Sequence, residues 1–272
     1  MQPDQHNTMN EARLYGLSWN EVHSGYFADP DVSRPFVSII ARAMEVQPPA
    51  LVADLGGGTG YILEEVLQEQ AYPGIRFVNV DMSGEQTSTC SNTRVESLNL
   101  NMSALTRAQF GITQENLMFI MRSVLHYLGQ DGLRPFLKHL RAQMQEGEIF
   151  VHQTACFKRD GDAACLNRLY QLMKTQKWYP VTGTLNRILN EEGFNVENTC
   201  PAPGLLLESA ELAERYHLSP EEVSAIGDEI SSSFGEIPGV LVRNRDGYAA
   251  YLHYEIFTCR ARPRSTKAGS FQ

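Results

Sequence analysis

The residues with the clearest chemical potential lie in the segment 52–66, VADLGGGTGYILEEV. An apolar run ends in an acid, Asp54, and continues into a glycine cluster and then a helical pattern. Glycine has no Cβ atom, so the chain can turn tightly there and a ligand can approach the backbone. The following helix N-terminus adds N–H groups and positive potential. Because nucleotide-type ligands bind at the carboxyl ends of strands in α/β sheets, the segment predicts such a site.

A second acid, Asp81, ends the next strand candidate, where a carboxylate can accept hydrogen bonds from two ribose hydroxyls. The glycine spacing argues against a dinucleotide. Residues 56–60 give G-x-G-x-G, and Tyr61 stands where the dinucleotide pattern G-x-G-x-x-G has its third glycine. Asp54 would also repel a diphosphate, but it would not repel a ligand with an ammonium group. A nicotinamide-dependent oxidoreductase is therefore a disfavoured alternative.

The combination resembles the class I S-adenosylmethionine-dependent methyltransferases. Their first motif, a strand ending in an acid followed by G-x-G-x-G, is matched by DLGGGTG, and their ribose-binding acid by NVDMS. The segment 115–128, ENLMFIMRSVLHYL, is similar to their fourth strand and following turn. The resemblance covers residues 50–160 well and 185–260 loosely. It implies an α/β fold, a seven-stranded, mostly parallel Rossmann-like sheet whose last strand is antiparallel.

The resemblance also implies S-adenosyl-L-methionine as the cofactor, with no metal. The glycines would line its methionine and ribose parts, Asp81 would hold the ribose, and Met82 would lie against the adenine. Asn99 and Asn101 stand where the family commonly contacts the adenine amino group, although acids are common there. The full set of expected cofactor residues is Asp54, Gly56, Gly57, Gly58, Gly60, Asp81, Met82, Asn99, Asn101 and Arg122.

Methyl transfer from a sulfonium is an in-line displacement that mainly requires the nucleophile to be held close and aligned. A general base is needed only where the nucleophile carries a proton of high pKa. The candidates follow the fourth strand (Arg122, Ser123, His126 and Tyr127) or end the fifth (His152 and Gln153), and the catalytic candidates among them are His126, His152 and Arg122. Both histidines can instead be packing residues, and Arg122 can bind a substrate carboxylate or pair with a local acid.

The acceptor expected from the sequence is a small metabolite, methylated on oxygen, nitrogen or carbon. The N-P-P-Y motif of nucleic-acid amino-methyltransferases is absent, and its place is held by Met121-Arg122-Ser123-Val124. The formal net charge of −9 and the lack of a basic, aromatic-interleaved stripe disfavour nucleic acid and anionic membranes as partners. A protein or RNA methyltransferase and a non-catalytic binding module stay open as alternatives.

Alternating apolar runs and helical patterns must position these residues. Strands are predicted at 51–55, 76–81, 116–121, 148–154, 193–199, 239–243 and 248–261, and helices at 20–46, 61–70, 103–110, 132–145, 163–175, 183–192 and 205–234. Such alternation predicts a parallel sheet with helices on both faces. Pro35 is expected in the first turn of its helix. Ser219 to Glu222 read as a capping box.

Two further expectations concern organisation. Residues 1–48 are expected to form an N-terminal helical lid, with Tyr15, Trp19 and Tyr26 over the site or packed on the sheet. Residues 49–272 are expected to form the cofactor-binding domain, with a helical insertion at about 200–236 that could also serve a homodimer. The polar N-terminus and five cysteines without a C-x-x-C pair favour a cytoplasmic location.

Overall fold

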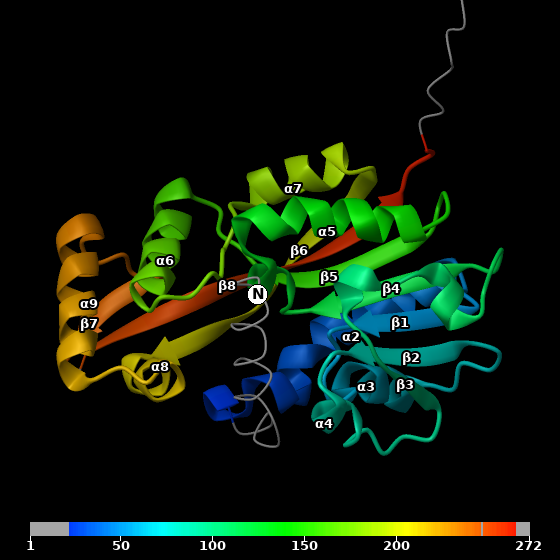
Figure 1. Cartoon of the computed structure of the whole chain (residues 1–272), viewed down its shortest axis with the longest axis horizontal. Coiled ribbons are helices and arrows are strands. Elements are labelled where there is room, and N and C mark those ends of the chain that lie inside the picture. Colours follow the sequence, from blue (N-terminus) through cyan, green and yellow to red (C-terminus); the bar gives the residue numbers. More distant parts are fainter. Residues whose placement is uncertain (1–21, 246, 265–272) are drawn as a thin grey trace, which may run out of the picture.

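The computed structural model describes residues 22–245 and 247–264, in which helices flank a single sheet (Figure 1). The strands are β1 (Leu51–Leu55), β2 (Arg76–Asp81), β3 (Val95–Asn99), β4 (Leu117–Arg122), β5 (Ile149–Ala155), β6 (Phe194–Glu208), β7 (Leu241–Asn244) and β8 (Gly247–Ala261). They follow the order β3-β2-β1-β4-β5-β8-β6, and β7 pairs only with β8. The predicted seven-strand path is therefore confirmed, with β7 as an eighth strand.

The first five strands run parallel, and β8 is antiparallel to β5, β6 and β7. The longer helices are α2 (Pro30–Val46), α3 (Tyr61–Glu69), α5 (Gly129–Gln143), α6 (Asp160–Leu172), α7 (Thr182–Glu191), α8 (Ser209–Tyr216) and α9 (Pro220–Phe234). The short ones are α4 (Gly84–Thr87) and the 3₁₀ turns η1 (Val22–Ala28), η2 (Met102–Ala104), η3 (Arg107–Phe110) and η4 (Leu125–Leu128).

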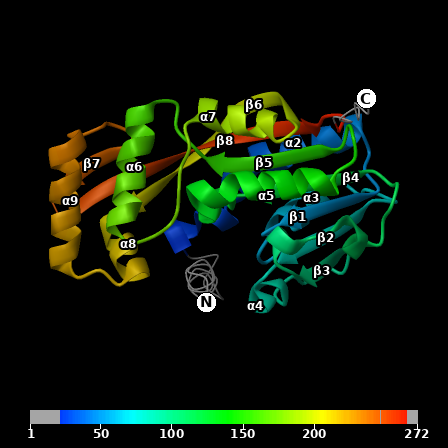
Figure 2. The same ribbon diagram turned by 45° about the horizontal axis from the view of Figure 1, so that its top comes forward.

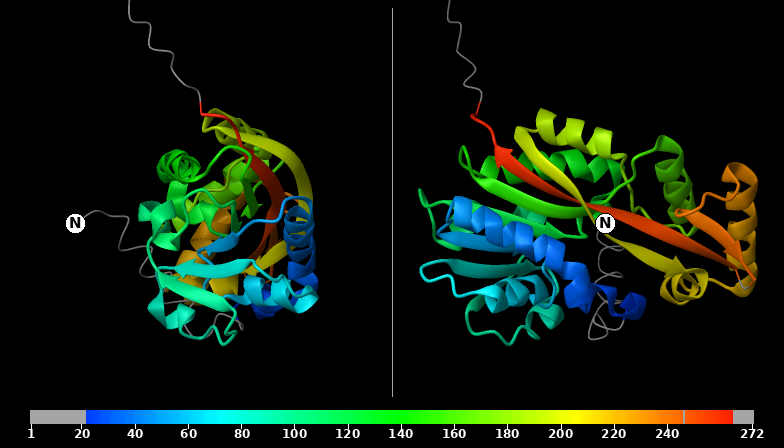
Figure 3. Two further views of the ribbon diagram at one scale, coloured as in Figure 1. Left: turned by 90° about the vertical axis from the view of Figure 1, so that its right-hand side faces the viewer. Right: turned by 180° about the vertical axis from the view of Figure 1, so that it is seen from behind.

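Helices α2 and α3 cover one face of the sheet, and α5 and α7 cover the other (Figures 1 and 3). Alternate residues of each strand point to opposite faces. On β1, Val52 joins the apolar cluster of α2 and α3, whereas Ala53 joins that of α5 and α7. Because α2 buries Phe36, Ile40 and Met44 in this cluster, it is a layer of the fold. The lid predicted for residues 1–48 therefore does not include α2.

The C-terminal half of β6 and the N-terminal half of β8 run beyond the parallel strands. Together with β7, α6, α8 and α9 they form a part that we term the extension (Figure 2). The extension has its own apolar cluster, which includes Leu169, Leu212, Ile230 and Tyr248. None of the described helices is both long and apolar enough to cross a bilayer.

Three predicted elements need correction. Residues 200–208 were expected in a helical insertion, but they continue β6 and pair with β8 up to Glu208, so only α8 and α9 are helical. The helix expected at 103–110 is instead two 3₁₀ turns, because Asn101 and Thr106 each cap a new turn through their side chains. Local hydrogen bonds from side chains to the backbone therefore divide this segment into two short helical turns.

The third correction concerns Pro35, which lies inside α2 and not in its first turn. The helix predicted at 20–46 is split into η1 and α2, and α2 begins at Pro30 because Asp29 accepts a hydrogen bond from the Asp31 N–H at 2.8 Å and proline is suited to the first helical position. The predicted capping box of α9 is confirmed, since Ser219 and Glu222 bond to each other's backbone N–H groups.

Candidate functional site

Five polar side chains share one edge and one face of the sheet. On β1, Asp54 follows Val52 by two residues, so both side chains point towards α2 and α3. Polar residues of β2, β4 and β5 also point towards α2 and α3. Each of them follows a residue of the apolar cluster of α2 and α3 by two or four positions along its strand. The set that meets at the carboxyl ends is Asp54, Asn79, Asp81, Arg122 and Gln153.

Asp54 is a buried acid without a partner. Its residue is 1% exposed, and neither carboxylate oxygen accepts a hydrogen bond from the described part of the chain. Burial, with repulsion from Asp81, raises the pKa of Asp54 to about 7, and Arg122 opposes the shift. An unpartnered buried carboxylate is costly for a folded protein. It is a group that a bound cation would satisfy.

The glycine turn packs directly on this acid. Gly56, Gly58 and Gly60 have φ angles of +73°, +56° and +83°, a region that favours glycine. Gly57 has no room for a side chain, because a Cβ atom would lie 2.6 Å from Asp54 Oδ2 and closer still to Asn79 Oδ1. The glycines that the sequence singled out thus let the backbone close over the strand ends.

Asp81 ties the end of β2 to the glycine turn. Its two oxygens accept hydrogen bonds from the Gly58 N–H at 2.9 Å and the Ser83 N–H at 2.8 Å. Burial raises the pKa of Asp81, although these backbone donors counteract the rise. Each carboxylate oxygen can accept a second hydrogen bond. The half-buried side chain can therefore still accept from a sugar hydroxyl.

The residues expected at the adenine have mixed positions. Met82 follows Asp81 and is 41% exposed, unusual for a large apolar side chain. Asn99 donates from Nδ2 to the Met82 carbonyl oxygen at 3.1 Å and so fixes this turn. Asn101 accepts from the Ser103 N–H at 2.9 Å as the cap of η2. Both amides thus have local structural bonds.

Arg122 is held on one side and unpartnered on the other. Its Nη1 donates to the Phe27 carbonyl oxygen at 2.9 Å, and its guanidinium lies 5.9 Å and 5.8 Å from the Tyr26 and Phe27 ring centroids. Burial lowers the pKa of Arg122. Nε and Nη2 are buried and make no hydrogen bond with any described residue. These two N–H groups form the edge with which arginine binds a carboxylate bidentately.

The two histidine candidates lie in different surroundings. His152 stacks on Phe257 with a centroid distance of 4.7 Å and an interplanar angle of 7°, and its Nδ1 lies 2.6 Å from Thr154 Oγ1. Its burial lowers its pKa to about 3, so it is neutral. His126 lies in η4, stacked on Tyr179 at 5.3 Å. Burial and two nearby cations, Lys177 and Arg215, lower its pKa well below the usual value.

Of the expected lid residues, Tyr15 and Trp19 lie outside the described residues. Tyr26 belongs to η1, where its hydroxyl donates to the Pro203 carbonyl oxygen at 2.5 Å and its ring stacks on Tyr254 at 5.9 Å. Tyr26 therefore packs on β6 and β8, next to Arg122.

Ser123 and Gln153 were expected at the strand ends from the sequence, but Asn79 was missed. Asn79 is buried and donates to the Gly58 carbonyl oxygen at 2.8 Å. Ser123 has a φ of +59° and, like Gln153, has buried side-chain atoms without a partner in the described chain. The available signal was a polar residue at an inward position of an otherwise apolar strand.

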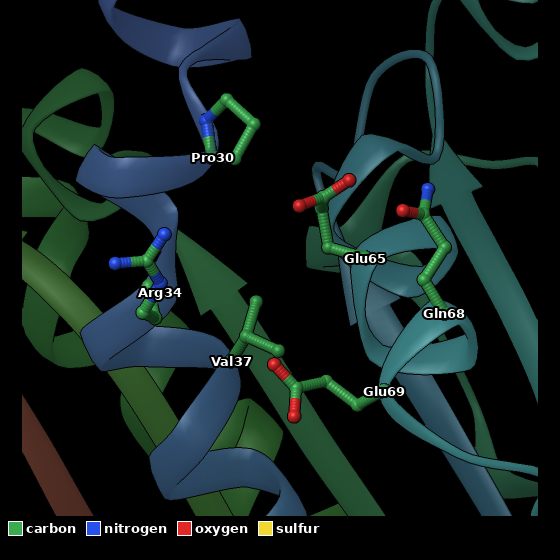
Figure 4. A pocket seen from close by; sticks show the side chains of 6 residues that line it. All are labelled: Pro30, Arg34, Val37, Glu65, Gln68 and Glu69. Carbon is green, nitrogen blue, oxygen red and sulfur yellow. The ribbon is translucent and has the colours of Figure 1, made fainter.

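A shallow hollow of about 220 Å³ lies elsewhere, between α2 and α3. Figure 4 shows Arg34 and Val37 of α2 facing Glu65, Gln68 and Glu69 of α3. None of the five polar residues of the strand ends lines this hollow. We therefore place the functional site at the carboxyl edge of the sheet and not in this hollow.

Neither a family model nor a curated protein matches the chain. Solved structures do. A Bacillus halodurans protein classed as a candidate methyltransferase is 13% identical with a TM-score of 0.61, and the match covers 83% of this chain and 100% of that one. The Burkholderia thailandensis 1,6-didemethyltoxoflavin-N1-methyltransferase, solved with 1,6-didemethyltoxoflavin and S-adenosylhomocysteine, is 17% identical with a TM-score of 0.57, over 97% and 92%.

A [4+2]-cyclase, SpnF, also matches, with 13% identity and a TM-score of 0.54 over 85% of this chain and 82% of that one. Identities of this size establish a shared fold and not a shared reaction. The chain therefore has the class I methyltransferase fold, and its reaction must be argued from the residues of its own site.

Proposed function

We propose that this chain, built on the class I methyltransferase fold, is an S-adenosylmethionine-dependent methyltransferase acting on a small molecule. The observation that carries the proposal is a pair of buried, oppositely charged side chains at adjacent strand ends whose hydrogen-bonding groups have no partner among the described residues. Asp54 presents a carboxylate without a partner, and Arg122 presents an unpartnered two-donor edge within the described chain. The two groups complement the ammonium and the carboxylate of an amino-acid arm.

The adenosine part of the cofactor fits the adjacent residues. The half-buried Asp81 can accept from the ribose hydroxyls, and the exposed Met82 offers an apolar surface to the adenine. Gly56, Gly57, Gly58 and Gly60 keep the backbone close to both. The toxoflavin-type methyltransferase with bound S-adenosylhomocysteine has the same fold, which supports this choice of ligand. For Asn99 and Asn101 we propose a role in shaping the adenine end.

When bound, the cofactor supplies a methyl group on a sulfonium, which is already activated for displacement. The chain then has to align the acceptor and exclude water. Both candidate histidines are poor bases, because burial lowers their pKa values. We therefore propose an acceptor atom that is nucleophilic without help from a strong base, such as a nitrogen or an already ionised oxygen. Arg122 would act by positioning the cofactor, and His126 would line the acceptor side.

Several features favour a small acceptor over a nucleic acid. The net charge is −9, and at the end of β4 the chain has Met121-Arg122-Ser123-Val124 in place of a base-clamping motif. The turn η1 reaches Arg122 and Pro203 and thus connects the site to β6. We propose that η1 covers the site as a lid.

The proposal is tested by calorimetry with S-adenosylhomocysteine, S-adenosylmethionine and NAD⁺. We expect micromolar binding of the first two and none of NAD⁺, and Asp81→Ala should weaken binding at least about tenfold because it removes a charged acceptor. Asp131→Ala, an exposed acid in the first turn of α5, is the matched control. Binding of NAD⁺ alone would instead support the oxidoreductase alternative.

A further inference from the structure

Gln153, at the carboxyl end of β5, is the most isolated amide in the site. The residue is fully buried, yet neither Oε1 nor Nε2 has a hydrogen-bond partner among the described residues. A buried amide N–H donor and a buried amide oxygen without hydrogen bonds each lower the stability of the folded state. A glutamine kept under these conditions is expected to have a ligand that supplies the complementary groups.

The backbone fixes Gln153 in place. Its carbonyl oxygen accepts from the Ser123 N–H at 2.9 Å, and Ser123 adopts a φ of +59°, a strained value for a residue with a side chain. Gln153 also pairs in register with Arg122 of β4, so the two side chains lie on the same face. The amide is therefore held one strand farther from the glycine turn than Arg122.

An aromatic pair lies beside the amide. Gln153 is close enough to the Tyr26 phenol to lower its pKa, against a larger rise caused by burial. The Tyr26 hydroxyl is nevertheless committed to the Pro203 carbonyl oxygen at 2.5 Å, and the amide does not reach hydrogen-bond geometry with it. Tyr26 stacks on Tyr254. A flat ligand at Gln153 would thus have aromatic surface next to it.

We propose that Gln153 selects the methyl acceptor and recognises a planar ring with adjacent N–H and C=O groups, a lactam or cyclic imide. A carboxamide pairs with such an edge through two parallel hydrogen bonds, as glutamine does with the donor and acceptor of adenine. The inference rests on the proposed function, in which Asp54 and Arg122 take the cofactor's charges. A carboxylate acceptor is excluded by this pairing, because its second oxygen would face Oε1.

Three bicyclic probes test the proposal by calorimetry in the presence of saturating S-adenosylhomocysteine. They are 2-quinolone, which has the lactam edge, quinoline, which lacks the N–H and the carbonyl, and 2-naphthoate, which is a carboxylate. The wild-type protein should bind 2-quinolone at least about tenfold more tightly than either of the others, the scale of one well-made buried hydrogen bond. Gln153→Leu should remove this preference, and Gln171→Leu on the exposed side of α6 should keep it.

Two further readouts separate the possible failures. Gln153→Leu should melt at the same temperature or higher, because it removes two unsatisfied polar atoms, and it should bind S-adenosylhomocysteine within about twofold of wild type. If S-adenosylhomocysteine does not bind the wild type, the proposed function itself fails. If it binds but 2-quinolone shows no preference, or keeps its preference in Gln153→Leu, the assignment of Gln153 is overturned.

Discussion

A buried acid at the amino ends of the strands and one at their carboxyl ends differ in their hydrogen bonding. Glu148, just before β5 at the amino edge, and Asp54, at the carboxyl edge, are each 1% exposed. Glu148 accepts from Arg107 Nη1 at 2.9 Å and from the N–H groups of Leu117 and Gln145 at 2.7 Å each. Asp54 accepts from no described residue. Burial and charge alone therefore do not mark a site, whereas unmet hydrogen-bonding capacity does.

Neighbouring residues of β5 repeat this contrast across the two faces. The side chain of His152 lies between aromatic rings and has Thr154 as a hydrogen-bond partner. The next residue, Gln153, points to the α2 and α3 face and has no partner in the described chain. The first arrangement stabilises a core, and the second leaves donors and acceptors for a ligand. Substitutions on the two sides of this division are therefore expected to have different effects on stability and on binding.

The largest effect is expected for Gly57→Ala, which forces a methyl group against Asp54 and Asn79. Both neighbours are buried and would have to shift, so we expect a loss of about 2–4 kcal/mol in the free energy of unfolding. Binding of S-adenosylhomocysteine should be lost as well. Thermal melts and calorimetry measure the two effects.

Gly183→Ala is the matched control, because a Cβ atom there meets no neighbour and α7 tolerates alanine. It should leave binding unchanged and should melt at the same temperature or slightly higher, because alanine favours a helix over glycine. A Gly57→Ala protein that binds as tightly as wild type would show that the glycine turn does not shape the site.

The next effect compares the two acids directly. Glu148→Gln should lower the free energy of unfolding by about 3 kcal/mol, because it breaks a buried pair with Arg107. Asp54→Asn should instead raise it at pH 8, by up to about 4 kcal/mol, and abolish S-adenosylhomocysteine binding. Urea denaturation at several pH values measures both.

The sign for Asp54 follows from its raised pKa. In the folded state the Asp54 carboxyl stays protonated up to about pH 7, because its pKa is about 7. In the unfolded state its pKa is 3.8, so it loses the proton at a lower pH. The free energy of unfolding of the wild type therefore decreases as the pH rises from about 4 to about 7. The stability advantage of Asp54→Asn over the wild type should vanish near pH 4. A destabilised Asp54→Asn protein at pH 8 would mean that Asp54 has a partner in the folded chain.

A smaller effect is expected for His152→Phe, confined to acid. The folded pKa of about 3 lies below the ordinary 6.5, so His152 costs stability as the pH falls from 6.5 towards 3. Replacing it should move the acid-unfolding midpoint to lower pH and leave S-adenosylhomocysteine binding within about twofold. Circular dichroism follows the midpoint. A large loss of cofactor binding would place His152 in the site after all.

The sequence predicted the parts of the site that depend on local chemistry. The turn at 56–60 and the acid Asp81 could be recognised because their residue types follow from what the backbone must do there. Gln153 could be placed at the end of its strand but not distinguished from its neighbours, because its importance lies in the lack of a side-chain hydrogen-bond partner among the described residues. Residues 200–208 were assigned to a helix because pairing with β8, a tertiary contact, decides their conformation.

The assignment of the two charges of an amino-acid arm to Asp54 and Arg122 can be tested by comparing S-adenosylhomocysteine with 5′-methylthioadenosine, which lacks that arm. In calorimetry at pH 8, we predict that S-adenosylhomocysteine binds at least about a hundredfold more tightly than 5′-methylthioadenosine. At pH 6, where Asp54 is protonated, the affinity for S-adenosylhomocysteine should be about tenfold lower than at pH 8. The affinity for 5′-methylthioadenosine should be insensitive to pH. Equal affinities for the two compounds, unchanged between pH 6 and 8, would contradict this assignment.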